Sequence, residues 1–348
     1  MDLIGDLFKD ENPPLIVAEL SGNHGNSKRK ALELVERAVL SGADAVKIQT
    51  YQPDTITVKA RDSRFLLSDG LWKGKYLDEL YAEAMTPWEW HEELAQKAKD
   101  LGAFLFSSPF DETAVDFLEK TLSPPLYKVA SFEMNHFPML KRIGRTGKPV
   151  LASTGVSTES EIQDSISTLR SNGCPQVVLL HCVSEYPAKI EKSCLRRMNA
   201  LGERFQVPFG LSDHSMGHLL PVAATAMGAG IIEKHFTLDR EDHSSDGKFS
   251  LLPEEFQEMA TAVRLAHSSL GKGEVDGFIA TEKSRHFKRS ILVAEKISAG
   301  DALTNKNIRV ARPGDGLCPS RWEEVLGKTS KFDLQIGHAL REEDLNIQ

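Results

Sequence analysis

The stretch VPFGLSDHSMGHLLPVAATAMGAGIIEKH (residues 207–235) contains the pattern that decides the fold. It opens and closes with apolar runs that end in polar residues, with His214 after the first run and His235 at the end of the second. A segment long enough for one helix separates the two runs. This arrangement is typical of a βαβ unit, in which the two strands lie parallel. We therefore predict parallel strands whose polar ends lie at the same edge of a sheet.

Similar units recur along most of the chain. Apolar runs occur at residues 15–19, 45–49, 103–108, 126–131, 149–154, 177–182, 207–213 and 230–235. Successive runs start 23 to 30 residues apart, except for 58 residues between the second and the third, which indicates one insertion. Eight strands that alternate with helices form a closed TIM (β/α)8 barrel of roughly 250 residues. We assign this α/β barrel to residues 1–280.

The pattern changes near residue 287. Beyond it the apolar runs are short, at residues 290–293 and 307–310, and turn-forming residues separate them. Only one brief helical piece is expected, at residues 322–326. We predict a second, small and β-rich domain at residues 288–348.

Composition limits the classes of partner. The chain of 348 residues has 42 lysines and arginines against 50 aspartates and glutamates, a net charge of −8. This balance provides no general positive field for nucleic acid or for an anionic membrane surface. No apolar run approaches the roughly 20 residues of a membrane span, and the N-terminal residues show no signal-peptide pattern. We expect a cytoplasmic protein that binds neither nucleic acid nor a membrane.

Polar side chains end nearly every predicted strand, at the edge of a barrel where active sites form. Lys47 and Lys128 lie in two such strands. The hydroxyls expected beside them are those of Ser108, Ser131, Ser153 and Ser212. Two ammonium groups and several hydroxyls can hold one oxyanion, so this pattern predicts a phosphate or carboxylate pocket. A strand lysine that forms a Schiff base, as in aldolases, is the alternative.

Two histidines are the strongest candidates for metal ligands. His214 and His235 end consecutive predicted strands, which places them on the same rim of the barrel. Neutral imidazoles suit Mn, Zn, Fe or Co. Glu19 and Asp246 can supply oxygen ligands or act as acid and base. The sequence therefore predicts a metal or acid–base centre at the strand ends.

Two other stretches carry aromatic or polar side chains without a defined chemical motif. We interpret Trp72 and the run TPWEWH (86–91) as aromatic packing around a helix start, with Thr86 as the N-cap. The loop REDHSSDGKFS (240–250) follows the last predicted strand. A solvated loop and a substrate lid are equally compatible with its composition.

Several of these segments resemble one known family. They are IVAELSGNHG, AVKIQTY, FSSPFD, YKVASFE, ASTG, LLHCVSEYPA, FGLSDHS and IIEKHFT. In this order, and across nearly the whole chain, they resemble the nonulosonic acid synthases, the sialic acid synthase family. The resemblance implies a TIM barrel followed by a small SAF domain, which is similar to antifreeze proteins. It also implies the condensation of phosphoenolpyruvate with a six-carbon amino-sugar aldehyde to give a nine-carbon α-keto acid and phosphate.

The resemblance implies roles for individual residues. The positions that match the phosphoenolpyruvate site are Lys47, Ser108, Lys128, Ser131, Ser153 and Ser212. A divalent metal ion, commonly Mn²⁺ or Mg²⁺, is expected at His214 and His235. The positions expected to contact the sugar are Gln49, Glu133, Ser184, Tyr186 and Asp246, and Glu19 is the expected proton-transfer group.

Details of the motifs indicate a branch of that family. ELSGNHG, KIQTY, LWKG (71–74) and TPWEWH are most similar to the pseudaminate branch, whose sugar is 2,4-diacetamido-2,4,6-trideoxy-L-altrose. The sialic and legionaminic branches, which use other hexoses, are the alternatives. The family also implies a homodimer whose SAF domain swaps onto the partner barrel, where Arg312 of RPGDGL reaches the sugar. A non-catalytic sugar-binding or ice-binding protein is the alternative from another class.

Overall fold

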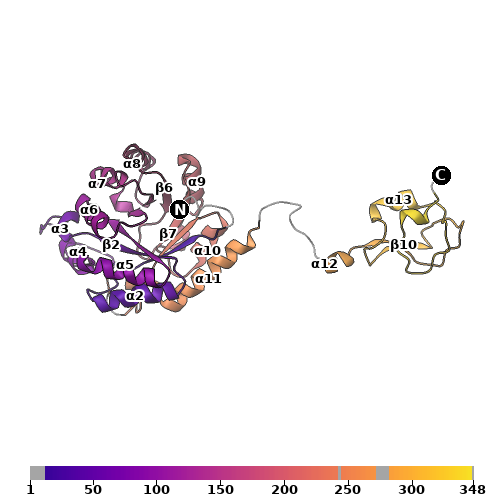
Figure 1. The fold of residues 1–348 in the computed structure, drawn as a ribbon, viewed down its shortest axis with the longest axis horizontal. Helices are drawn as coiled ribbons and strands as arrows, with labels where there is room; N and C mark the ends of the chain where they lie inside the picture. Colours follow the sequence, from indigo (N-terminus) through magenta and orange to yellow (C-terminus); the bar gives the residue numbers. More distant parts are fainter. Residues whose placement is uncertain (1–11, 242–243, 272–281, 347–348) are drawn as a thin grey trace. The chain divides into compact units, whose positions relative to one another are not determined.

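The structure, a computed structural model, describes residues 12–241, 244–271 and 282–346. The chain divides into two compact units, Met1–Gly271 and Lys272–Gln348. Figure 1 shows strands surrounded by helices in the first unit, and a small sheet with short helices in the second. The boundaries predicted from the sequence, 1–280 and 288–348, stay a prediction.

Eight parallel strands close into a barrel within the described part of the first unit. They are β1 (Leu15–Glu19), β2 (Ala45–Thr50), β3 (Phe104–Pro109), β4 (Tyr127–Val129), β5 (Val150–Ser153), β6 (Val177–His181), β7 (Phe209–Asp213) and β8 (Ile231–His235). β1 closes the barrel because it pairs with both β2 and β8, and Glu19 lies opposite Lys47 on one side and His235 on the other. The predicted TIM-like barrel is confirmed, and the predicted apolar runs form its strands.

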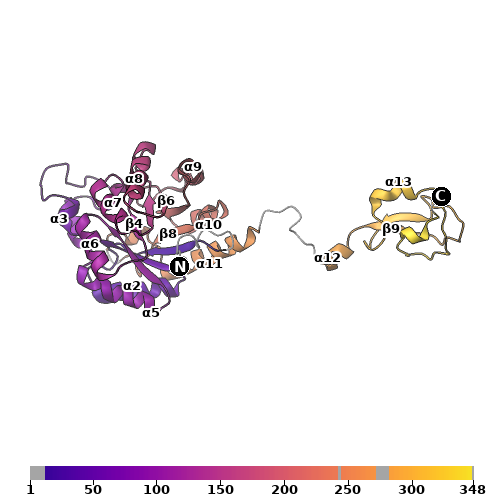
Figure 2. The ribbon, with the colours of Figure 1, turned by 45° about the horizontal axis from the view of Figure 1, so that its top comes forward.

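Helices connect the strands and lie around the barrel (Figure 2). They are α2 (Lys28–Leu40), α3 (Pro53–Ile56), α4 (Leu77–Ala84), α5 (His91–Asp100), α6 (Glu112–Thr121), α7 (Phe137–Gly144), α8 (Glu159–Ser171), α9 (Arg196–Phe205), α10 (Leu219–Ala226) and α11 (Pro253–Ser269). The predicted insertion between the second and third strands holds α3, α4 and the short helix η1 (Trp88–Trp90). Of the helices that the structure describes, none is both long and apolar enough to cross a membrane.

Capping side chains begin some of these helices directly after a strand. Asp111 follows β3, and its carboxylate accepts a hydrogen bond from the backbone N–H of Ala114 (2.9 Å), which satisfies a free donor of α6. The cap predicted at Thr86 is wrong. Pro87 precedes η1, and the Thr86 hydroxyl is instead hydrogen-bonded to Nε2 of buried His24 (3.2 Å).

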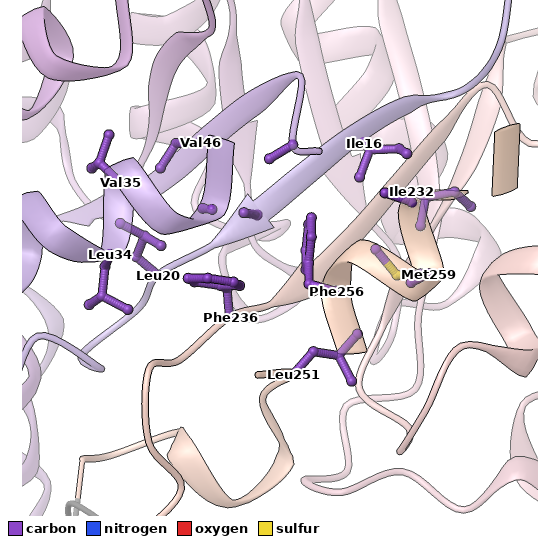
Figure 3. Close-up of a cluster of buried hydrophobic side chains, with 14 of the residues drawn as sticks. Ile16, Leu20, Leu34, Val35, Val46, Ile232, Phe236, Leu251, Phe256 and Met259 are labelled. Carbon is purple, nitrogen blue, oxygen red and sulfur yellow. The ribbon is translucent and has the colours of Figure 1, made fainter. Parts of the chain in front are cut away.

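The alternation of side chains along the strands separates two apolar layers. Outward residues such as Ile16, Val46 and Ile232 pack with Leu34 of α2 and Phe256 of α11 (Figure 3). Inward residues fill the amino-terminal part of the barrel, and they are Leu15, Val17, Ala45, Phe106, Leu126, Leu151, Val178, Leu180 and Ile231. Since strand side chains alternate with a period of two, the next inward positions toward the carboxyl ends are the polar ones. The interior of the barrel therefore changes from apolar to polar along the strands.

The second unit has its own small core. The described part of it contains a two-stranded antiparallel sheet of β9 (Ser290–Val293) and β10 (Ile308–Ala311). Its short helices are α12 (Glu282–His286), η6 (Pro319–Arg321), α13 (Trp322–Val325) and η7 (Glu342–Asp344). Buried apolar side chains that include Ile291, Ile308 and Val325 form the core. The predicted small β-rich domain is confirmed.

Candidate active site

A cavity of about 460 Å³ lies at the carboxyl ends of the barrel strands. This volume is within the range of sites that bind small molecules. Its polar lining includes Glu19, Ser21, Lys47, Gln49, Lys128, Ser131, Glu133, Ser153, Ser184, Tyr186, Ser212, His214, Glu233, His235, Ser245 and Asp246. The polar residues that end the strands thus converge on one cavity.

Two lysines and two glutamates lie together at the base of this cavity. Nζ of Lys47 lies 2.5 Å from Oε2 of Glu19 and 3.7 Å from Oε1 of Glu233. Nζ of Lys128 lies 3.9 Å from the same Glu233 oxygen, and all four side chains are buried. We call these four residues, with Ser153 and Ser212, the polar floor. Glu233 lies between the two ammonium groups, so it holds both lysines in place before a ligand binds.

The hydroxyls beside the lysines accept their hydrogen bonds. Lys128 donates to Oγ of Ser153 (2.6 Å) and to the carbonyl of Val129 (3.1 Å). Lys47 donates to Oγ of Ser108 (3.4 Å) in addition to its contact with Glu19. An ammonium group has three N–H donors, and an oxygen of Glu233 is the remaining close partner of each lysine, 3.7 Å from Lys47 and 3.9 Å from Lys128, so an incoming oxyanion would compete with this carboxylate. This arrangement suits a phosphate or a carboxylate.

Burial and charge act in opposite directions on the ionisation of the floor. Burial lowers the pKa of Lys128 below its ordinary value, and Glu233 offsets only part of this effect. Burial alone would lower the pKa of Lys47 too, but the carboxylates of Glu19 and Glu233 raise it. Burial would raise the pKa of Glu233, yet Lys128 and Lys47 hold it below its ordinary value. Glu233 is therefore a permanent anion at neutral pH.

Glu19 differs from Glu233 although the two carboxylates share Lys47. Burial raises the pKa of Glu19, and Lys47 offsets only part of the shift. Oε1 of Glu19 accepts hydrogen bonds from the backbone N–H of Ser21 (3.0 Å) and from Nε2 of Gln49 (3.3 Å). The left-handed backbone of Ser21 (φ 47°) turns its N–H back toward this carboxylate. Two carboxyl groups with pKa values shifted apart can take different roles, and Glu19 is the one able to carry a proton.

His214 and His235 lie side by side at the rim, with ring centroids 5.3 Å apart. Nδ1 of His214 donates to the carbonyl of Val183 (2.8 Å), which leaves Nε2 with a free lone pair. Nδ1 of His235 is buried and has no hydrogen-bond partner among the described residues. Burial lowers the pKa of both rings, so both are neutral imidazoles, the form that binds metal ions.

The protein supplies only some of the ligands that a divalent metal ion needs. No group of three or more His, Cys, Asp or Glu side chains suited to a metal lies together in the described parts of the chain. Two imidazoles are nevertheless present, one with an unpaired buried nitrogen and one oriented by a backbone carbonyl, as metal-binding histidines are. Oδ2 of Asp246 lies 3.9 Å from Nδ1 of His235. A metal held here would take its other ligands from water and substrate.

The loop after β8 packs onto the rim in its described part. Asp246 is buried, its carboxylate accepts a hydrogen bond from Oγ of Ser21, and its backbone N–H donates to Oδ1 of Asn23 (3.1 Å). Oγ of Ser250 donates to the Asp246 carbonyl (2.7 Å). Burial raises the pKa of Asp246 to about 6. The segment 244–250 is therefore a packed wall of the site and not a solvated loop.

Three further predicted sugar contacts lie at the mouth of the cavity. Burial raises the pKa of Glu133 to about 7, and its Oε2 has no hydrogen-bond partner in the described part of the structure. The ring of Tyr186 lies 4.5 Å from that of His214, measured between centroids. Oγ of Ser184 lies 2.8 Å from Oγ of Ser131. These side chains provide hydrogen-bonding groups between the histidines and the solvent.

The structure brings nearly all of the predicted site residues together. Every predicted residue of the barrel lines the cavity except Ser108, which lies beneath it and accepts a hydrogen bond from Lys47. Arg312 follows β10 in the second unit, where its side chain is exposed. The roles assigned to these residues stay predictions.

Glu233, Ser21 and Trp72 line the cavity, although no role in the site was predicted for them. Glu233 and Ser21 were visible as polar strand-end residues, and a period-two count from Ile231 places Glu233 in the same inward phase as His235. Trp72 gave no such signal, because its position depends on the path of an irregular loop. The interpretation of Trp72 as a packing residue alone is incomplete, since it lines the cavity and its Nε1 donates to the carbonyl of Ser245 (2.8 Å).

Comparisons with known proteins agree along the whole chain. Residues 34–275 match the NeuB family, and residues 288–346 match the SAF domain. The chain is 44% identical over 322 residues to the pseudaminic acid synthase of Helicobacter pylori, which covers 92% of this chain and 94% of the relative. It is 42% identical over 337 residues to that of Campylobacter jejuni, with 97% and 98% covered.

A solved structure supports the same relationship. The N-acetylneuraminic acid synthetase of Leptospira borgpetersenii, crystallised with citrate, superposes with a TM-score of 0.69 and 28% sequence identity. The match covers 78% of this chain and 90% of that chain. The sequence and fold comparisons therefore lead to one family.

Proposed function

The chain belongs to the NeuB family, and we propose that it condenses phosphoenolpyruvate with 2,4-diacetamido-2,4,6-trideoxy-L-altrose and water to give pseudaminic acid and phosphate. Relatives with 42% and 44% identity over nearly their full length support this sugar. The observation that carries the reaction class is the polar floor, where Lys47 and Lys128 face one cavity. In the reaction, C3 of phosphoenolpyruvate bonds to the aldehyde carbon, water adds to C2, and the C2–O bond to phosphate breaks.

The polar floor is the proposed phosphoenolpyruvate site. Lys47 and Lys128 would bind the carboxylate and phosphate oxygens, and Ser131, Ser153 and Ser212 would add hydroxyl donors. Charged donors in a water-poor cavity stabilise negative charge that develops on the leaving phosphate. The carboxylate of Glu233 partly offsets the charge of the two lysines. The floor therefore binds the anionic phosphoenolpyruvate less tightly than two unpaired lysines would, which keeps its binding reversible.

Glu19 is the proposed proton carrier. Formation of the C–C bond leaves negative charge on the aldehyde oxygen, and addition of water to C2 releases one proton. A carboxyl group whose pKa is raised by burial can take up that proton and deliver it to the oxygen. Glu233 is unsuited to this role, because the two lysines keep it ionised.

His214 and His235 are the proposed ligands of a divalent metal ion, Mn²⁺ or Mg²⁺. When bound, such an ion would polarise the aldehyde oxygen and orient the water molecule. The protein side of this site consists of two neutral imidazoles, with the ring of Tyr186 packed against His214. Gln49, Asp246 and the other predicted contacts at the cavity mouth would bind the sugar hydroxyl and amide groups.

The SAF domain is proposed to complete the site in a homodimer. Arg312 is exposed in the second unit, in the turn that follows β10. We assign to it a contact with the sugar in the barrel of a second copy, in a domain-swapped arrangement. Mixing an Arg312→Ala variant with a variant inactive in the barrel tests this assignment, because only a swapped heterodimer restores one complete site.

Product analysis tests the proposed function directly. The protein is incubated with phosphoenolpyruvate and a panel of 2,4-diacetamido and N-acetyl hexoses, and phosphate release and product mass are measured. We expect phosphate only when both substrates are present, and none after exhaustive chelation. A preference for N-acetylmannosamine or for the legionaminate precursor would reassign the sugar within the family. Borohydride trapping of a lysine adduct would instead favour a Schiff-base aldolase, for which the lowered pKa of Lys128 is the supporting observation.

A further inference from the structure

One side of the cavity is apolar and comes from the insertion between β2 and β3. We call it the apolar wall, and its residues are Leu67, Trp72, Leu77, Leu80 and Tyr81. The polar floor comes from the barrel strands and bears charges, whereas the wall offers aliphatic and aromatic carbon. A ligand that fills the cavity must therefore present a charged part to the floor and an apolar part to the wall.

The backbone of the insertion holds the wall in a defined conformation. The N–H of Leu67 donates to the carbonyl of Lys75 (2.9 Å), and the N–H of Leu77 donates to the carbonyl of Phe65 (2.9 Å). Residues 65–67 thus pair with residues 75–77, and α4 follows with buried Leu80. Neighbouring extended residues point to opposite sides, which explains why Leu67 lines the cavity while Leu66 is exposed.

Trp72 joins the wall to the opposite side of the cavity. Its indole N–H donates to the carbonyl of Ser245 in the loop after β8 (2.8 Å). Its ring lies 6.0 Å from that of Tyr186, which in turn packs against His214. The wall is therefore continuous with the rim that carries the histidines.

We propose that the apolar wall selects the hexose by its terminal methyl group, so that Leu67, Trp72 and Leu77 determine sugar specificity. This inference rests on the proposed function. The aldehyde carbon must meet phosphoenolpyruvate above the polar floor, and C6 is the carbon of a six-carbon chain that lies farthest from it. A C6 methyl group would bury apolar surface against the wall, whereas a C6 hydroxyl would lose its water without gaining a partner. Apolar pockets discriminate between such groups by roughly 10-fold to 200-fold.

A matched pair of sugars tests this assignment. The two substrates are 2,4-diacetamido-2,4,6-trideoxy-L-altrose and the same sugar with a hydroxyl at C6, each with phosphoenolpyruvate. We expect the unaltered protein to prefer the methyl sugar in kcat/KM by about 10-fold or more. Leu67→Gln introduces a hydrogen-bonding group into the wall and is expected to reduce that preference to about 2-fold. Leu66→Gln is the control, because it makes the same change one residue away on the exposed side.

The outcomes separate this inference from the proposed function. An unaltered protein that uses both sugars equally, or a Leu67→Gln variant that keeps the full preference, would overturn the role of the wall while the synthase activity stands. If neither sugar yields phosphate, the proposed function and the inference fail together. Leu77→Gln provides a second test from the start of α4, where the side chain is half-buried, and we expect it to reduce the preference as well; a full preference kept by this folded variant would also contradict the proposal.

Discussion

The polar floor and the apolar wall share one cavity but are built in different ways. Strand register fixes the floor, since residues such as Glu19 and Lys47, or Ser212 and Glu233, are paired partners on neighbouring strands. One irregular excursion between β2 and β3 provides the wall. A change in the floor must move the barrel, whereas a change in the wall alters only a loop and a short helix. This difference lets one fold keep a reaction while its loops vary the substrate.

The largest effect is expected from a change to the floor. Lys128→Met removes one of the two ammonium groups but keeps an unbranched side chain of similar length. We expect kcat/KM to fall by about 10³-fold, because a positioned donor in a buried site contributes roughly 10²-fold to 10³-fold and Glu233 also loses a counter-ion. The measurement is phosphate release at varied phosphoenolpyruvate concentration.

Lys141→Met is the control for the Lys128 variant, since Lys141 is exposed near the end of α7. It makes the same chemical change outside the cavity. A Lys128→Met enzyme that remained within threefold of the control would show that the floor does not bind the reacting anion.

The next effect concerns the rim that both regions adjoin. His235→Ala removes a neutral imidazole with an unpaired nitrogen, and we expect the affinity for Mn²⁺ to fall at least about 100-fold, since loss even of residues that support metal ligands costs 10-fold to 100-fold. Calorimetric titration of the metal-free protein measures this affinity independently of activity. His136→Ala removes a histidine outside the cavity, so equal losses in the two variants would contradict the assigned site.

Most of the fold and the floor could be predicted from the sequence because both follow from periodicity. The apolar runs marked the strands, and strand ends of a parallel barrel meet at one edge, so Lys47, Lys128 and His214 were correctly expected to converge. The same period-two count identifies Glu233 when it is continued from the apolar layer. Local pattern was enough here, because every floor residue lies on a regular element.

The wall could not be predicted in the same way. Trp72 lies at the turn between two short segments, and its direction depends on the pairing of residues 65–67 with residues 75–77 and on its hydrogen bond with Ser245, far away in the sequence. Neither interaction leaves a periodic signal. The cap expected at Thr86 was wrong for a related reason, since a distant partner, His24, takes its hydroxyl.

A smaller effect is expected on the pH dependence of stability. It concerns Glu133, at the mouth of the cavity. The pKa of Glu133 in the folded protein, about 7, lies above the ordinary 4.5, so the folded state holds this proton more tightly. The contribution of this bound proton to the stability of the folded state is fully present below pH 4.5, and it is lost as the pH rises through 7. Relative to Glu133→Gln, which cannot ionise, the unaltered protein should lose about 2 kcal/mol of unfolding free energy between pH 5 and 7.

Urea unfolding at a series of pH values measures this difference. Glu203→Gln removes an exposed carboxyl group from α9 and is the control. Parallel stability profiles for the unaltered protein and Glu133→Gln would mean that Glu133 is solvated in solution.

The smallest effect is expected from a variant that keeps an aromatic ring at position 72 but removes the hydrogen bond of Trp72. This variant tests whether that bond connects the apolar wall to the rest of the cavity. Trp72→Phe keeps an aromatic ring beside Tyr186 but removes the donor to the Ser245 carbonyl. A neutral hydrogen bond contributes about 1 kcal/mol, so KM for the sugar should rise about 5-fold with kcat within twofold. Trp88→Phe removes a similar bond, to the Tyr51 carbonyl (3.1 Å), from a side chain outside the cavity lining. If both variants raise KM equally, the Trp72 hydrogen bond has no special part in holding the apolar wall. If KM rises only in Trp72→Phe, the loop after β8 holds the wall in place through this bond, and sugar binding depends on it.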